Sequence, residues 1–146
     1  MQVIHEKRAL VQRVSEWRVA GRRLGFVPTM GALHAGHLSL LQRARPGCDR
    51  VAGSIFVNPL QFGAGEALER YPRDLEGDLR RLGDAGCDLV FAPAAGDMYA
   101  AEARTTVDVG ELGEVLCGRT RPGHFRGVTT VVAKLFNLVQ PQVAVF

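Results

Sequence analysis

The chain has 146 residues, which is enough for one domain with a substantial hydrophobic core. Hydrophobic residues make up 47% and charged residues 23%, which is ordinary for a soluble globular protein, and no apolar stretch approaches the length of a membrane span. The net charge of +3 comes from arginines that are spread along the chain, without the basic tract that a nucleic-acid partner requires.

The cysteine content and the N-terminus indicate the cellular compartment. The three cysteines are odd in number and far apart, so we expect no disulfide framework. We expect the protein to reside in a reducing compartment. Residues 1–7 carry no apolar core of the kind that a secretory signal has. We therefore expect a cytoplasmic protein that binds neither nucleic acid nor membranes.

Hydrophobic periodicity predicts alternating helices and strands along the chain. An amphipathic helix is predicted over residues 3–20, ending at Gly21, with later helices over 38–44, from a cap at Asp74 to Gly86, over 111–116, and over 128–139. Buried strands are predicted over residues 24–27, 51–57, 87–93 and 143–146, and a more exposed strand over 105–109. Connecting segments include a mobile loop at 63–65, a single turn at 97–99 and a basic, glycine-rich loop at 118–127.

This alternation predicts an α/β fold in which a Rossmann-like parallel sheet is flanked by helices. The glycine fingerprint of dinucleotide-binding enzymes is absent after the strand at 24–27, which argues against an NAD enzyme. In open sheets of this kind, ligands bind at the carboxyl edge of the strands. Two segments follow strands directly and are therefore candidate sites, namely residues 28–37 and 58–63.

The first candidate segment carries two histidines at the predicted start of a helix. His34 and His37 are three residues apart, so their rings share one helix face. Gly31 and Gly36 let a ligand approach the main chain, and the first N–H groups of a helix lack intrahelical partners, which together predicts an anion site. An ordinary helix start remains an alternative. A zinc site is a second alternative, although His5, His124 and the cysteines form no ligand-spaced cluster with the pair.

Residues 28–37, Pro-Thr-Met-Gly-Ala-Leu-His-Ala-Gly-His, resemble the signature of the pantothenate synthetase (pantoate–β-alanine ligase) family. That family belongs to the nucleotidylyltransferase superfamily with the HIGH motif. Three later stretches in the same order also resemble family signatures, at residues 54–62, 71–74 and 121–128. The resemblance covers essentially the whole chain and implies the nucleotidylyltransferase type of the α/β fold.

The resemblance implies a two-step ligase of coenzyme A biosynthesis. In the first step the carboxylate of pantoate attacks the α-phosphorus of ATP, which gives pantoyl adenylate and pyrophosphate. In the second step the amine of β-alanine displaces AMP and forms the amide of pantothenate. Negative charge on phosphate oxygens has to be stabilised in the first step, and donors at a helix start suit that role.

The resemblance also implies roles for particular residues. His37 is implied as proton donor to the phosphates with His34 as its partner, and the residues that line the ATP site are implied to be Met30, Gly31, Ala32, Leu33, His34, Ala35, Gly36 and His37. Gln61 is implied to contact pantoate or the neighbourhood of β-alanine, and Asn58 to shape the same pocket. From spacing alone, both amides could equally be turn-forming residues. His124 and Arg126 either face the site or lie in a solvated loop.

The family uses ATP with Mg²⁺ and is usually a homodimer, so both are expected here. Asp78 lies where the family often has paired acidic residues, but its neighbour is Gly77, and the protein ligands of the metal are therefore unknown. The resemblance makes residues 1–146 the N-terminal nucleotide-binding domain, without the C-terminal lid domain of the family, so catalysis by this chain alone is in question. Two other functions remain open, a non-catalytic domain that binds ATP or pantoate, and another nucleotidylyltransferase.

Overall fold

A computed structural model describes residues 1–63, 66 and 68–146, so two of the three residues of the loop predicted at 63–65 lie outside the described part. The strands are β1 (Gln2–Ile4), β2 (Leu24–Thr29), β3 (Arg50–Ile55), β4 (Leu89–Phe91) and β5 (Val143–Ala144). The α-helices are α1 (Lys7–Val19), α2 (Ala35–Ala44), α3 (Leu75–Asp84), α4 (Ala95–Met98) and α5 (His124–Val139). Short 3-10 helices are η1 (Pro59–Gln61), η2 (Leu68–Arg70), η3 (Gly110–Glu114) and η4 (Leu116–Arg119).

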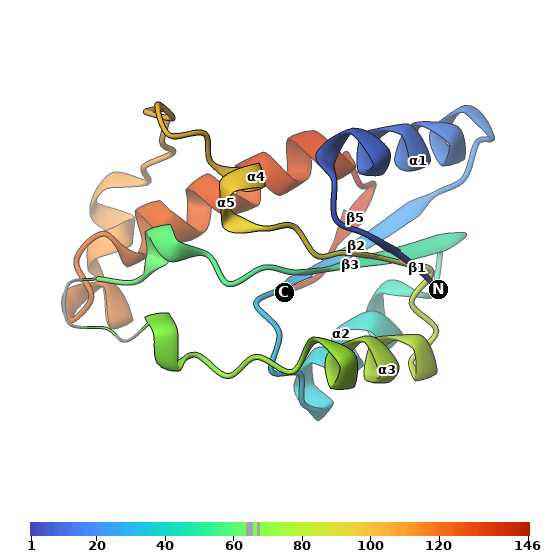
Figure 1. Ribbon diagram of the computed structural model, residues 1–146, viewed down its shortest axis with the longest axis horizontal. Coiled ribbons are helices and arrows are strands. Elements are labelled where there is room, and N and C mark those ends of the chain that lie inside the picture. The colour runs from blue at the N-terminus through green and yellow to red at the C-terminus, as the bar shows by residue number, and fades with distance from the viewer. Residues whose placement is uncertain (64–65, 67) are drawn as a thin grey trace.

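The five strands form one parallel sheet in the order β1-β4-β3-β2-β5, so the predicted fold class is confirmed. Helices α1 and α5 cover one face of the sheet, and α2 and α3 cover the other (Figure 1). Because every strand is parallel to its neighbours, the carboxyl ends of β2, β3 and β4 meet at one edge. The segments predicted to carry function, after β2 and after β3, both leave the sheet at this edge.

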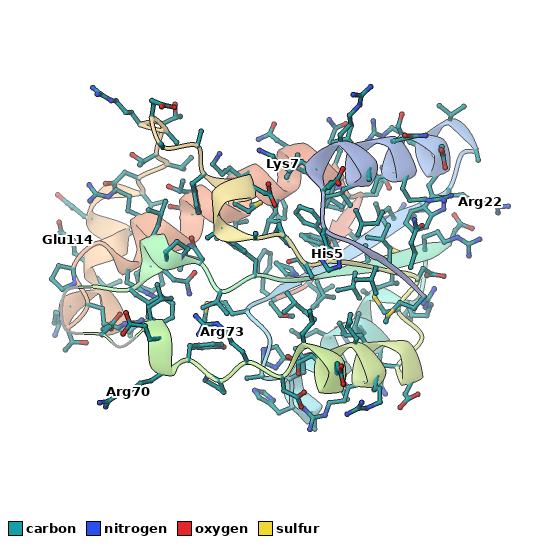
Figure 2. The ribbon with its side chains drawn as sticks, viewed as in Figure 1. His5, Lys7, Arg22, Arg70, Arg73 and Glu114 are labelled. Carbon is teal, nitrogen blue, oxygen red and sulfur yellow. The ribbon has the colours of Figure 1, made fainter. Side chains whose placement is uncertain are left out.

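Alternation of side chains along the strands divides the core into two layers. Phe26 and Phe91 belong to the cluster under α1 and α5, whereas their chain neighbours Val27 and Val90 belong to the cluster under α2 and α3. All four side chains are buried, as expected for a sheet with both faces covered. Charged side chains such as Arg22, Arg70 and Glu114 extend outward at the edges of the molecule (Figure 2).

Several helices begin and end as the sequence predicts. The side chain of Asp74 caps α3 by accepting a hydrogen bond from Gly77 N at 3.0 Å. Helix α5 ends at Val139 and is followed by a left-handed residue, Gln140, directly before Pro141. It begins at His124, four residues earlier than its apolar periodicity indicates, so part of the predicted basic loop is helical. None of the described helices is long and apolar enough to cross a membrane.

Two predicted elements are wrong, and the single helix predicted over residues 111–116 is instead two 3-10 helices, η3 and η4, which are separated at Val115. The first helix does not start at residue 3, because residues 2–4 pair with β4 as strand β1, and this contact lies 87 residues away in sequence. The exposed strand predicted over residues 105–109 does not form, because that segment bonds α5 instead. The backbone N–H of Val107 donates to Thr130 Oγ1 at 2.9 Å rather than to a neighbouring strand.

A close approach joins α5 to the turn after β3. A Cβ atom at Gly127 would lie 2.2 Å from the carbonyl oxygen of Leu60, which is far inside van der Waals contact. Glycine at this position therefore lets α5 lie directly against η1. As a consequence, α5 lies beside the carboxyl edge of the sheet, although it begins more than sixty residues after η1 in the sequence.

Candidate functional site

The two predicted histidines lie side by side where β2 leads into α2. His34 is the N-cap residue of α2, and its Nδ1 accepts a hydrogen bond from Gly36 N at 3.1 Å. The Nδ1 of His37 accepts from His34 N at 3.4 Å, so the pair closes a reciprocal cap. The ring centroids are 4.2 Å apart. The predicted sharing of one face by the two rings is therefore confirmed.

This cap determines which ring nitrogens are available. Because Nδ1 of each ring accepts a hydrogen bond, the hydrogen of the neutral ring sits on Nε2. Within the described part of the chain, neither Nε2 has a hydrogen-bond partner. His34 and His37 therefore present two neighbouring N–H donors.

The environment of His37 favours its neutral form. Burial lowers the pKa of His37 below 6.5, the charge of His34 lowers it further, and Asp78 opposes both. The unfolded chain therefore binds this proton more readily than the folded chain does. The stability that His37 contributes is present above pH 6.5 and is lost as the pH falls from 6.5 through the lower pKa of the folded state.

The loop before the histidines is held by one buried carboxylate. Asp78 on α3 is 1% exposed, and its two oxygens accept hydrogen bonds from Ala32 N and Leu33 N, both at 2.8 Å. Arg81, one turn further along α3, donates to the carbonyl oxygen of Leu33 at 2.8 Å. Ala32 has a φ of 53°, which is a left-handed conformation. This conformation is unfavourable for any residue that has a Cβ atom, so it persists only where surrounding contacts stabilise it. Asp78 supplies those contacts.

These contacts reduce the number of backbone N–H groups that the loop leaves free. The N–H groups before and at the start of α2 were expected to be free to bind an anion, but those of Ala32 and Leu33 donate to Asp78. The N–H groups of His34 and Gly36 donate to the ring nitrogens of the two histidines. The ring Nε2 atoms, rather than these backbone groups, are therefore the donors that the turn offers.

The same geometry bears on a metal. Both oxygens of Asp78 are engaged by backbone N–H groups, so this carboxylate is not oriented as a metal ligand. Among the described residues, no group of three or more histidines, cysteines or acids could hold a metal ion. The zinc alternative thus gains no support, and these residues do not fit a Mg²⁺ site built by the protein.

The second predicted segment, after β3, forms a buried turn. Asn58 caps η1 by accepting from Leu60 N at 3.3 Å, so its turn-forming role is real. Its Nδ2 also donates to Gln61 Oε1 at 3.1 Å and to the carbonyl oxygen of Gly127 at 3.0 Å. Asn58 and Gln61 are 1% and 8% exposed. Nε2 of Gln61 contacts Met30 Sδ at 3.0 Å, which brings the two predicted segments together.

A cavity of about 230 Å³ lies between these segments and α5. Its polar lining includes His37, Asn58 and Gln61, and Met30 also contributes to it. Apolar residues of α5 form the opposite wall, namely Val128, Val131, Val132 and Leu135. The volume is below the roughly 300–1,000 Å³ of pockets for drug-sized ligands, so it suits a small polar molecule with an apolar part.

The basic loop supports the turn from outside the cavity. Nδ1 of His124 lies 2.9 Å from the carbonyl oxygen of Gln61. Arg121 bonds the same oxygen at 3.4 Å and pairs with Glu66, and this hydrogen-bonded pair lowers the pKa of Glu66 to about 2. Arg126 lines a separate cavity, which Leu60 of η1 and His124 also line, and neither of the two predicted loop residues lines the cavity beside His37.

Two contributors to the site have no local pattern in the sequence. Asp78 reaches the histidine loop across 46 residues, and Tyr99 donates from its hydroxyl to Asn58 Oδ1 at 2.8 Å across 41 residues. The resemblance to paired acids singled out Asp78, but as a metal ligand. Only the tertiary structure shows either contact.

We expect His37 to titrate below pH 6.5 because burial and the neighbouring His34 both disfavour its charged form. NMR measurement of the ring carbon-bound protons against pH tests this. The His34→Gln variant should move the His37 pKa upward but leave it shifted, because burial is the larger cause. A wild-type pKa at or above 6.5 would contradict this description of the ring environment.

Asp78→Asn should lower the free energy of unfolding by about 1–3 kcal/mol. The amide of asparagine has a single acceptor oxygen, so one of the two backbone N–H groups that now donate to Asp78 would lose its partner. Urea unfolding followed by circular dichroism measures the loss. Asp84→Asn on the exposed end of the same helix is the matched control and should change stability little. Equal stability of the two variants would show that Asp78 does not hold the loop.

The sequence matches a family of known proteins along its length. The family model for pantoate–β-alanine ligase matches residues 2–146. A pantothenate synthetase from Heliobacterium modesticaldum is 58% identical over the whole chain, and one from Rubrobacter xylanophilus is 60% identical over 89% of it. These alignments cover 52% and 47% of the two relatives. The chain therefore spans about half the length of the curated relatives that it matches.

Solved structures agree with these matches. Pantothenate synthetase from Thermus thermophilus is 52% identical with a TM-score of 0.86, over 99% of this chain and 51% of that one. Pantoate–β-alanine ligase from Francisella tularensis, complexed with β-γ ATP and β-alanine, is 35% identical with a TM-score of 0.92, over 99% of this chain and 55% of that one. The chain belongs to the pantoate–β-alanine ligase family.

Proposed function

We propose that this chain carries the ATP- and pantoate-binding part of an AMP-forming ligase that joins pantoate to β-alanine. The observation that carries the proposal is the cavity in which His37, Asn58 and Gln61 converge at the carboxyl edge of the sheet. Family membership supplies the reaction, and the ligand-bound structure of the Francisella tularensis relative supports ATP and β-alanine as substrates. The chain itself is proposed as the N-terminal nucleotide-binding domain.

The proposed ATP site is the loop and helix start over residues 30–37. The Nε2–H groups of His34 and His37 donate to phosphate oxygens, and His37, which also lines the cavity, is the donor nearest to the reacting carboxylate. These donors are held in place before ATP arrives, because the cap and Asp78 determine the loop conformation. Preorganised donors of this kind stabilise charge that develops on the transferred phosphorus.

The proposed pantoate site is the cavity beside this loop. Gln61 presents its amide to the carboxylate or hydroxyl oxygens of pantoate, Asn58 orients Gln61, and the α5 wall packs against the apolar part of the molecule. A pantoate carboxylate oxygen attacks the α-phosphorus of ATP, the bond to the β-phosphate breaks, and pyrophosphate leaves. The amine nitrogen of β-alanine then attacks the acyl carbon, AMP leaves with the mixed-anhydride oxygen, and the amine gives up a proton.

Mg²⁺ belongs to the proposal only as the ion that ATP brings on its phosphates. No reaction step passes through a metal held by the protein, because the described residues do not fit such a site. The proposal also places the protein in the cytoplasm, which the three free cysteines Cys48, Cys87 and Cys117 support.

The activity is tested by pantoate-dependent release of pyrophosphate from ATP. Any pyrophosphate release by the wild-type chain should fall about a hundredfold in His37→Ala, because the loss of a charge-stabilising donor has that effect on the rate. His5→Ala is the matched control, since His5 bonds the carbonyl oxygen of Ala92 and does not line the cavity. Full activity of His37→Ala would remove His37 from the mechanism. ATP binding without release would indicate a non-catalytic binding domain.

We also propose that the protein forms a homodimer. An exposed apolar surface, the 107–116 patch, runs over η3 and η4, and its apolar members are Val107, Val109, Leu112, Val115 and Leu116. Leu112 and Leu116 are 76% and 84% exposed. In Figure 1 this segment lies on the outside of the molecule beside the start of α5. Apolar side chains grouped in this way are typical of a protein interface.

Sedimentation equilibrium tests the dimer. The wild-type chain should have the mass of two copies, and the double variant Leu112→Glu/Leu116→Glu should have the mass of one, because burying carboxylates in an apolar interface is costly. Val19→Glu is the control, since Val19 is 88% exposed on α1, away from the patch. A monomeric wild type, or a double variant that still dimerises, would contradict the assignment of this patch.

A further inference from the structure

We propose that Tyr99 is a positioning residue that acts through Asn58 to make Gln61 present an N–H donor, not an oxygen, to the ligand in the cavity. The proposal rests on the proposed function for the identity of that ligand, pantoate. It adds a specificity rule to that function, since the site then selects an acceptor oxygen at this point. We call Tyr99, Asn58 and Gln61 the amide relay.

Asn58 lies at the centre of the amide relay, with all of its hydrogen-bonding capacity in use. Its Oδ1 accepts from Tyr99 Oη at 2.8 Å and from Leu60 N at 3.3 Å. Its Nδ2 donates to the carbonyl oxygen of Gly127 and to Gln61 Oε1. A backbone N–H can only donate and a carbonyl oxygen can only accept, so the orientation of this amide is determined by its partners.

The orientation of Asn58 is passed on to Gln61. Because Asn58 gives its N–H to Gln61 Oε1, the Nε2 of Gln61 must turn the other way, toward Met30 and the cavity. The present acceptor of Nε2 is a thioether sulfur, which is a weak one. A carboxylate or hydroxyl oxygen of a ligand would be a better acceptor, so exchanging the sulfur for such an oxygen favours binding.

Tyr99 is positioned to donate to Asn58 Oδ1, which the backbone partners of Asn58 leave as the acceptor facing it. Its ring packs beside Phe56 with centroids 6.1 Å apart, and Lys134 Nζ lies 5.3 Å from the ring centroid. Burial raises the pKa of Tyr99 to about 12, so the hydroxyl keeps its proton at physiological pH. Tyr99 is absent from the cavity lining, and its hydroxyl reaches that lining through the hydrogen bond to Asn58, while its ring packs on Phe56 in both the wild type and Tyr99→Phe.

The relay makes a prediction about selectivity. If the amide of Gln61 were reversed, its oxygen would face the anionic ligand and repel it, and Nε2 would face the N–H of Asn58. Both mismatches leave buried polar groups unpaired, which costs affinity. Removing the Tyr99 hydroxyl leaves Asn58 Oδ1 with only the longer bond from Leu60 N, so the amide pair loses part of its orientation.

The test compares pantoate and ATP binding by isothermal titration calorimetry on the 146-residue chain. In Tyr99→Phe the dissociation constant for pantoate should rise about three- to tenfold, which corresponds to one net hydrogen bond, while that for ATP stays unchanged. Lys134→Gln is the matched control, because it removes the cation beside the same ring and keeps the hydroxyl. Its pantoate affinity should equal that of the wild type.

A double-mutant cycle separates positioning from general stability. In an Asn58→Ala background, Tyr99→Phe should cause no further loss of pantoate affinity, because its route to Gln61 is already gone. Wild-type pantoate affinity in Tyr99→Phe would overturn the relay. The relay would also be overturned if Tyr99→Phe weakened ATP binding as much as pantoate binding. The same holds if Tyr99→Phe lowered pantoate affinity by the same factor in the Asn58→Ala background as in the wild type.

A second readout does not depend on the ligand. The side-chain amide protons of Gln61 should give two distinct NMR signals whose shifts change in Tyr99→Phe and not in Lys134→Gln. If the wild-type chain binds no pantoate, the proposed function fails, and these signals alone decide the relay. Identical Gln61 signals in the wild type and Tyr99→Phe would show that no relay exists.

Discussion

The carboxylate of Asp78 is the contact on which the site depends. It lies inside the molecule and is stabilised by the N–H groups of Ala32 and Leu33 and by the half-exposed Arg81, 3.7 Å away. Those bonds hold Ala32 in a left-handed conformation, and the chain then enters α2 with His34 as its cap. Without them the loop would be free to relax, and the two histidine rings would lose their common orientation.

The parallel sheet supplies the second constraint. Because β2 and β3 are adjacent and parallel, the histidine loop and the Asn58 turn leave the sheet next to each other. Helix α5 closes the cavity from the other side, and it can do so because Gly127 lets its backbone touch η1. The histidine N–H donors and the amide-lined pocket thus share one edge, which is the arrangement that the proposed acyl-adenylate reaction requires.

Local patterns predicted the parts of this structure that local physics controls. Apolar periodicity placed α3 and strands β2 to β5, and Asp74 was correctly predicted as a cap, because these features depend on neighbours in sequence. Strand β1 was missed because a three-residue strand exists only through its pairing with β4. The structural role of Asp78 and the contact from Tyr99 could not be predicted, since both span more than forty residues.

The most direct test of this account is a crystal structure of the chain with pantoate and a non-hydrolysable ATP analogue. We predict a pantoate oxygen within about 3 Å of Gln61 Nε2, and a phosphate oxygen at a similar distance from His37 Nε2. Pantoate in another cavity, such as the one of about 280 Å³ beside Asp74, would contradict the account. Phosphates bound away from His34 and His37 would contradict it equally.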